Sequence, residues 1–169
     1  MNRGQPNRWI VTTDSRHARV FAWERTPGGV LRLEALRWID NPHEAEHDRA
    51  RASELVLASA GAPGRGVPQG ASEGDTSEEE RKFARELAGR GGWLSRSIRE
   101  LKADRVTVFA PPRFLGLLRE EMDADTGRGD GPIPECVTFE AVELTHLRPG
   151  ELALHPRVVR AVESSTCSR

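Results

Sequence analysis

The sequence of 169 residues has no tyrosine, only two cysteines and very little lysine. The cysteines, Cys136 and Cys167, are too few for a disulfide framework and lack the spacing of metal ligands. No apolar run is long enough to span a membrane, and the first residues, MNRGQPNRW, lack the apolar segment of an export signal. We therefore expect a reduced, cytoplasmic chain with no membrane insertion, no bound metal and no cofactor.

Lysine is so scarce that almost all of the 25 cationic side chains are arginines; the exceptions are Lys82 and Lys102. The formal net charge is −1, so the total charge favours neither nucleic acid nor an acidic membrane as a partner. Arginine is well suited to binding phosphate, but the codon preference of a GC-rich genome explains the same composition. Any binding of RNA must therefore depend on the local placement of arginines.

The stretch DRVTVFAPPRFLGLLREEM, residues 104–122, contains the clearest structural signal. Arg105–Ala110 is a β-branched apolar run typical of a buried strand, and Pro111-Pro112 ends it because proline cannot donate to a sheet. An amphipathic helix over Phe114–Met122 can begin at once, since proline is tolerated in the first turn of a helix. A buried strand followed by such a helix is half of a βαβ unit and indicates the α/β class.

The rest of the chain contains an antiparallel meander, a long helix, and a final strand and helix. The predicted strands are Trp9–Thr13, Ala18–Glu24, Val30–Ile39 and Cys136–Leu147. The predicted helices are a short one across His43–Ala58, a long one over Thr76–Lys102 that Gly91-Gly92 would kink or break, and Glu151–Val162 with an interruption at Pro156.

These elements make up a single α/β domain over residues 1–163, followed by a C-terminal tail at 164–169. We expect a mixed sheet of about five strands flanked by helices. Residues 40–76 form a long loop that is rich in Gly, Pro and Ser from Gly61 to Gly74. Loops of such length are usually functional or disordered.

The segment FAPPRFLGLLRE, preceded by EEERKFAREL, resembles the bacterial host-attachment protein family. TDSRHARVF near the N-terminus and PGRG at residues 63–66 also match the family pattern, and the resemblance extends from about Trp9 to Pro156. The family name reflects a proposed role in attachment to host cells. The family is in turn similar to the central domain of archaeo-eukaryotic peptide-chain release factors, which implies a release-factor-like α/β fold that associates with RNA on the ribosome.

Arg65 and Gln69 in the Gly-rich loop are the first candidate binding residues. Glycines let the backbone approach a ligand closely, and Arg65 offers a planar fork for phosphate. In the release-factor domain that the family resembles, a loop before the long helix contains a Gly-Gly-Gln tripeptide that acts in peptidyl-tRNA hydrolysis. Here GRGVPQG includes Gln69 but no Gly-Gly pair, which argues against release activity. The alternative is a mobile surface linker.

Arg113 is the third candidate binding residue. It follows the carboxyl end of the Arg105–Ala110 strand, where open α/β sheets bind ligands, and it begins a helix whose free N–H groups attract anions. The alternative is a solvated or ion-paired arginine.

Two enzyme-like patterns are weaker. His43 and His47 are spaced like a helical metal pair, but the HExxH arrangement is missing and a solvated helix face is favoured. Asp14 ends the first predicted strand, as a carboxylate does in ribonuclease-H-like metal nucleases. No acid ends the Arg105–Ala110 strand, so a role of Asp14 in the turn is favoured.

The resulting hypothesis is a non-enzymatic cytosolic module that associates with RNA or the ribosome, with Arg65, Gln69 and Arg113 as its binding residues. Two alternatives remain open. One is a protein-interaction factor that acts in attachment to host cells, and the other is a hydrolase that acts on tRNA or RNA. The expected partner is accordingly structured RNA, the ribosome or a protein, and the sequence does not indicate an oligomeric state.

Overall fold

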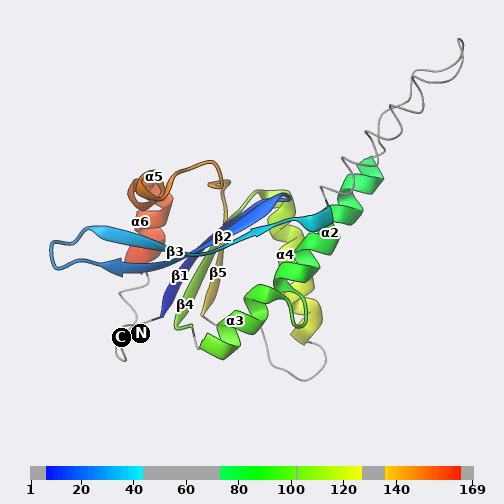
Figure 1. Cartoon of the computed structure of the whole chain (residues 1–169), viewed down its shortest axis with the longest axis horizontal. Helices are drawn as coiled ribbons and strands as arrows, with labels where there is room; N and C mark the ends of the chain where they lie inside the picture. Colours follow the sequence, from blue (N-terminus) through cyan, green and yellow to red (C-terminus); the bar gives the residue numbers. More distant parts are fainter. Residues whose placement is uncertain (1–6, 44–72, 102, 127–135, 165–169) are drawn as a thin grey trace, which may run out of the picture.

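The structure is a computed structural model that describes residues 7–43, 73–101, 103–126 and 136–164 (Figure 1). The strands of these residues are β1 (Arg8–Thr13), β2 (His17–Arg25), β3 (Leu31–Asp40), β4 (Arg105–Ala110) and β5 (Val137–Ala141). They form one five-stranded sheet in the order β3-β2-β1-β4-β5. The β1–β2 and β2–β3 pairs are antiparallel, whereas the β1–β4 and β4–β5 pairs are parallel. The predicted mixed α/β sheet and its N-terminal meander are thus confirmed.

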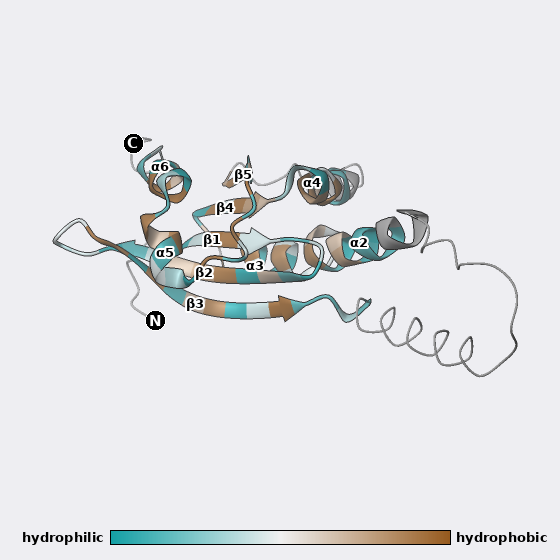
Figure 2. Ribbon diagram, turned by 90° about the horizontal axis from the view of Figure 1, so that it is seen from above, coloured by the Kyte–Doolittle hydropathy of each residue, from teal (hydrophilic) through white to brown (hydrophobic). Residues whose placement is uncertain are grey.

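Helices cover both faces of this sheet. They are α2 (Glu73–Ala88), α3 (Trp93–Leu101), α4 (Pro112–Thr126), α5 (Pro149–Leu154) and α6 (Pro156–Ser164). α2, α3 and α4 pack on one face and α5 and α6 on the other, so the domain has three layers (Figures 1 and 2). Within the described ranges, no helix combines the length and the apolar character needed to cross a membrane.

The first core joins the sheet to α2, α3 and α4, and the predicted strand–helix unit lies at its centre. Val106 and Val108 of β4 are fully buried, and Phe114 and Leu118 of α4 pack in the same cluster. Phe83 of α2 stacks on Phe114 with the ring centroids 5.9 Å apart. The apolar face that the sequence predicted for α4 is therefore the face that packs on the sheet.

The second core lies on the opposite face, beneath α5 and α6. Its buried members are Ile10, Phe21, Trp23, Phe109, Leu144, Leu152, Val158 and Val162. Odd-numbered residues of β2 face this core and even-numbered residues face the first core, as the alternation in the sequence predicts.

The predicted helix over 76–102 is broken into α2 and α3 where Gly91-Gly92 lie. Gly91 has a φ of +78°, in the region that glycine adopts readily, and the Gly92 N–H donates to the Gly89 carbonyl at 2.7 Å. α2 begins at Glu73, inside the predicted loop at 40–76. Most of that loop, and the predicted helix at 43–58 beyond its first residue, lie outside the described residues.

The last predicted strand is shorter than the pattern of residues 136–147 indicated, and that prediction was wrong in length. β5 ends at Ala141, and the Val142 N–H donates to the Glu140 carbonyl at 2.9 Å instead of continuing the sheet. The following residues bring Leu144 into the second core, where it is 2% exposed. The burial of Leu144 in the second core thus takes the place of further strand pairing after Ala141.

Gly92→Ala is expected to destabilise the fold by about 1–3 kcal/mol, the usual range for overpacking. A β-carbon at Gly92 would lie 2.8 Å from the backbone oxygens of both Gly89 and Leu87, so the turn between α2 and α3 would have to shift. Gly116→Ala is the matched control, because a β-carbon there meets no atom within 4 Å. That change should stabilise α4 by up to about 1 kcal/mol. Urea unfolding followed by circular dichroism measures both, and equal effects would contradict the assignment of the turn.

Candidate functional site

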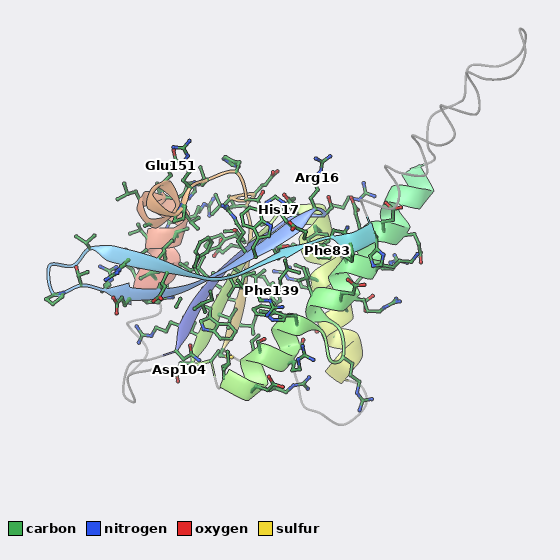
Figure 3. All side chains as sticks on the ribbon, viewed as in Figure 1. Arg16, His17, Phe83, Asp104, Phe139 and Glu151 are labelled. Carbon is green, nitrogen blue, oxygen red and sulfur yellow. The ribbon has the colours of Figure 1, made fainter. Side chains whose placement is uncertain are left out.

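The candidate site lies at the carboxyl ends of β1, β4 and β5. These three strands are parallel, so their last residues, Thr13, Ala110 and Ala141, lie at the same end of the sheet. Open α/β sheets bind their ligands at this end. Figure 3 shows Arg16 and His17 here, at the β1–β2 turn, with Asp104 at the other end of the sheet.

Asp14 organises the turn between β1 and β2. Its Oδ1 accepts hydrogen bonds from the backbone N–H groups of Arg16 and His17, at 2.8 and 2.9 Å. Its Oδ2 accepts a hydrogen bond from the Thr145 hydroxyl at 2.9 Å, which ties the turn to the loop after β5. In the part of the chain that the structure describes, no three His, Cys, Asp or Glu side chains cluster as a metal site. The predicted role of Asp14 in the turn is confirmed.

Arg19 of β2 is the charged residue that the sequence analysis missed. It is only 8% exposed, and its Nη2 donates to the Leu144 carbonyl at 3.2 Å. Its guanidinium lies over the rings of Phe21 and Trp38, at 5.7 and 5.5 Å from their centroids. The one signal in the sequence was that Arg19 alternates with Phe21 and Trp23 along the strand, so it occupies a position on the same apolar side.

The electrostatics of Arg19 are those of a buried cation. Burial lowers the pKa of its guanidinium, and the negative charge of Asp14 opposes this by raising it. Among the described atoms, Arg19 Nε and the Thr12 hydroxyl are buried without a hydrogen-bond partner. Thr12 and Arg19 are partners in the β1–β2 register, so these two polar groups occupy one location.

Trp38 of β3 lies beside this cluster and is 58% exposed. Its ring is stacked on His17, with an angle of 3° between the planes and 5.1 Å between centroids. Its Nε1–H donates to Asp40, which fixes the orientation of the ring. On its solvent side, the candidate site therefore consists of the ring of Trp38, whose orientation is fixed, above the buried guanidinium of Arg19.

Arg113 is exposed at the start of α4, as predicted, but it has an intramolecular partner. Its Nε lies 3.3 Å from Glu80 Oε2 of α2, and the Glu80 side chain is only 14% exposed. The structure therefore places Arg113 in the ion pair that was its alternative interpretation. Arg65, Gln69 and His47 lie outside the described residues.

Several acids near α2 contact basic side chains of the same domain. Glu86 Oε1 lies 2.7 Å from Nε2 of His43, and Glu121 of α4 accepts hydrogen bonds from Arg85. The outer surface of α2 and α3 is formed in part by exposed cations: Arg81, Lys82, Arg96 and Arg99. We call these four residues the cationic face.

Cys136, just before β5, is half-buried and unpaired by any disulfide. Burial raises the pKa of its thiol, with smaller opposing contributions from a backbone hydrogen bond and from Arg105. A raised pKa lowers the fraction of reactive thiolate near neutral pH. The environment of Cys136 is therefore that of a structural residue rather than of an activated nucleophile.

Comparison with known proteins gives a family and a structural neighbour. The family model described as "Protein required for attachment to host cells" matches residues 9–130. No curated protein matches the sequence. The crystal structure of an archaeal translation termination factor is similar at 15% sequence identity and a TM-score of 0.32. The similarity covers 94% of this chain and 39% of that protein, so the chain spans well under half of its length.

Proposed function

The chain belongs to the family of proteins required for attachment to host cells, and we propose that it acts as a non-enzymatic RNA-binding module of the cytoplasm. In this proposal the cationic face of α2 and α3 binds structured RNA, free or in the ribosome. The observation that carries the proposal is the division of charges around α2. The largely buried acids Glu80 and Glu121 are paired with arginines within the fold, while the four cations of the face remain exposed, next to the exposed acids Glu78 and Glu100.

This division matters because net charge alone, at −1, does not favour RNA. A carboxylate that is paired with an arginine of its own chain repels a nearby phosphate less than a free one. Arginine presents a planar fork of N–H donors that matches phosphate oxygens. Arg113 remains part of the proposal through its side chain, which is 66% exposed although it is paired with Glu80. Arg65 and Gln69 remain part of the proposal on the sequence alone.

The alternative of a hydrolase that acts on tRNA or RNA receives no support at Asp14. A metal nuclease needs its carboxylate oxygens free to bind magnesium. Both oxygens of Asp14 instead accept hydrogen bonds that hold the β1–β2 turn and the loop after β5. A binding role therefore fits this end of the sheet better than metal-dependent cleavage.

The proposal predicts a specific change in salt dependence. Arg96→Ala with Arg99→Ala should weaken binding to a fluorescent RNA hairpin and flatten the plot of log K against log salt. The slope should fall by about one unit for each phosphate that the variant no longer neutralises, because fewer counterions are released on binding. The measurement is a fluorescence-anisotropy titration at several salt concentrations.

The matched control is Arg157→Ala with Arg160→Ala on α6. These exposed arginines lie on the opposite face of the sheet, and their removal changes the net charge by the same amount. Control and wild type should have the same slope. Equal slopes for all three proteins would remove the cationic face from the binding surface. Absence of binding at low salt would contradict the proposal itself and favour the protein-interaction alternative.

A further inference from the structure

β3 is the long edge strand of the sheet, and α5 packs against part of it. It has ten residues and pairs only with β2 among the described strands. Figure 1 shows the β2–β3 hairpin extending past α5 and α6, with β3 along the outside. Leu36 is 48% exposed and Trp38 is 58% exposed, so two large apolar side chains of this edge lie in contact with solvent. Proteins usually protect such an edge, because it presents unpaired backbone groups to other strands.

A β-bulge divides β3 into two halves. Ala35 pairs with Phe21 and Arg37 with Val20, so Leu36 is an extra residue without a partner on β2. As a result, Glu34 and Arg37 face the same side of the sheet, although they are three positions apart. In a regular strand such residues face opposite sides.

The same shift places Leu33 and Trp38 together on the other side. Leu33 pairs with Trp23 and Trp38 pairs with Arg19, and both of these β2 residues face the second core. Each residue in the first half of β3 therefore has a counterpart on the same side in the second half, arranged symmetrically about the bulge.

This symmetry determines how β3 can pair with an identical strand. Full-length antiparallel pairing of two copies sets Leu31 opposite Asp40 and Glu34 opposite Arg37. A regular ten-residue strand cannot pair with itself in this way, because the opposed residues would face different sides of the sheet. With the bulge at Leu36, every opposed pair outside the centre faces the same side.

We propose that β3 is a homodimer interface, in which two copies pair antiparallel and join their sheets into one. The charges support a second copy as the occupant. Glu34 of each copy lies opposite Arg37 of the other, so the two-fold symmetry forms two cross-strand pairs of opposite charge. On the other face, Trp38 of each copy lies opposite Leu33 and covers it. Strand addition at a free edge is a common mode of recognition, and here strand and partner strand are the same.

The test is a charge exchange read out as molar mass by sedimentation velocity. Wild type should have twice the mass of one chain. In a dimer of the Glu34→Arg variant, both cross-strand pairs would consist of two arginines. In a dimer of the Arg37→Glu variant, both pairs would consist of two glutamates. Each variant should therefore be a monomer. The double variant restores opposite charges and should be a dimer again. A mixture of the two single variants should form a heterodimer, since one copy then supplies only arginines and the other only glutamates.

Arg32→Glu is the control, because it makes the same charge change on the same strand but lies opposite Ile39 in the proposed pairing. It should remain a dimer. Arg37 also lies over the Trp93 ring at 5.5 Å, so thermal unfolding must show that each monomeric variant is folded. A monomeric wild type at the highest soluble concentration would overturn the proposal, and the bulge would then be protection of the edge. Failure of the mixed single variants to associate would overturn it as well.

Discussion

Replacing Leu118 by alanine is expected to lower the free energy of unfolding by about 2–5 kcal/mol. Leu118 is 1% exposed and lies in the first core, where α4 meets the sheet. A cavity of about 10 Å³ already adjoins it, lined in part by Leu87, Leu94 and Val108. Truncation would enlarge this space, and the cost rises with the volume that the surroundings fail to fill. We therefore expect a loss in the upper half of the range.

The measurement for Leu118→Ala is urea unfolding at equilibrium, compared with Leu154→Ala. Leu154 on α5 is 78% exposed, so its truncation removes the same atoms with little loss of buried surface. The control should change stability by no more than about 0.5 kcal/mol. A loss of that size for Leu118→Ala would show that α4 does not pack on the sheet through this side chain.

The position of Leu118 could be predicted because its signals are local. The run Arg105–Ala110, the two prolines and the helical spacing of Phe114 and Leu118 all occur within one short stretch. Each of these local preferences agrees with the final fold, and such agreement is what makes a pattern readable without a structure. The meander of β1, β2 and β3 was predictable for the same reason, since turns and alternation determine adjacent strands.

The polar part of the candidate site could not be predicted, because its contacts are far apart in the sequence. Arg19 donates to the carbonyl of Leu144, 125 positions away, and Asp14 accepts from Thr145, 131 positions away. Both contacts depend on β5 ending early at Ala141, where the pattern favoured a longer strand. A single sequence shows alternation within a strand but not which distant loop will lie over it.

The charge balance around α2 was likewise not readable from composition. The sequence shows acids and arginines mixed along the helix, which suggests that their fields cancel. In the structure Glu80 and Glu121 are largely buried, at 14% and 17% side-chain exposure, and each is paired with an arginine of a neighbouring helix. These two carboxylates are thus withdrawn from the outer surface, where Glu78, Glu86 and Glu100 remain exposed beside the four cations.

Asp14→Ala is expected to destabilise the protein by about 1–3 kcal/mol, although Asp14 is one residue in a turn. The change removes the acceptor of three hydrogen bonds, from Arg16, His17 and Thr145. It also removes the negative charge that stabilises the buried guanidinium of Arg19. Most of the expected loss comes from the donors that are left without an acceptor, because an unsatisfied buried donor costs more than the hydrogen bond contributed.

Two further variants separate the charge from the hydrogen bonds of Asp14. Asp14→Asn retains an acceptor for the two backbone N–H groups but has no charge, so its loss should be intermediate. Arg19→Met retains much of the apolar contact with Phe21 and Trp38 while removing the cation.

In the double variant Asp14→Ala/Arg19→Met the two effects should not add, with a coupling of about 0.5–3 kcal/mol. Additive losses would show that Asp14 does not compensate Arg19. A loss below about 0.5 kcal/mol for Asp14→Ala would mean that the carboxylate is not needed for folding, and a ligand-binding role for Asp14 would then become the better explanation of its position at this end of the sheet.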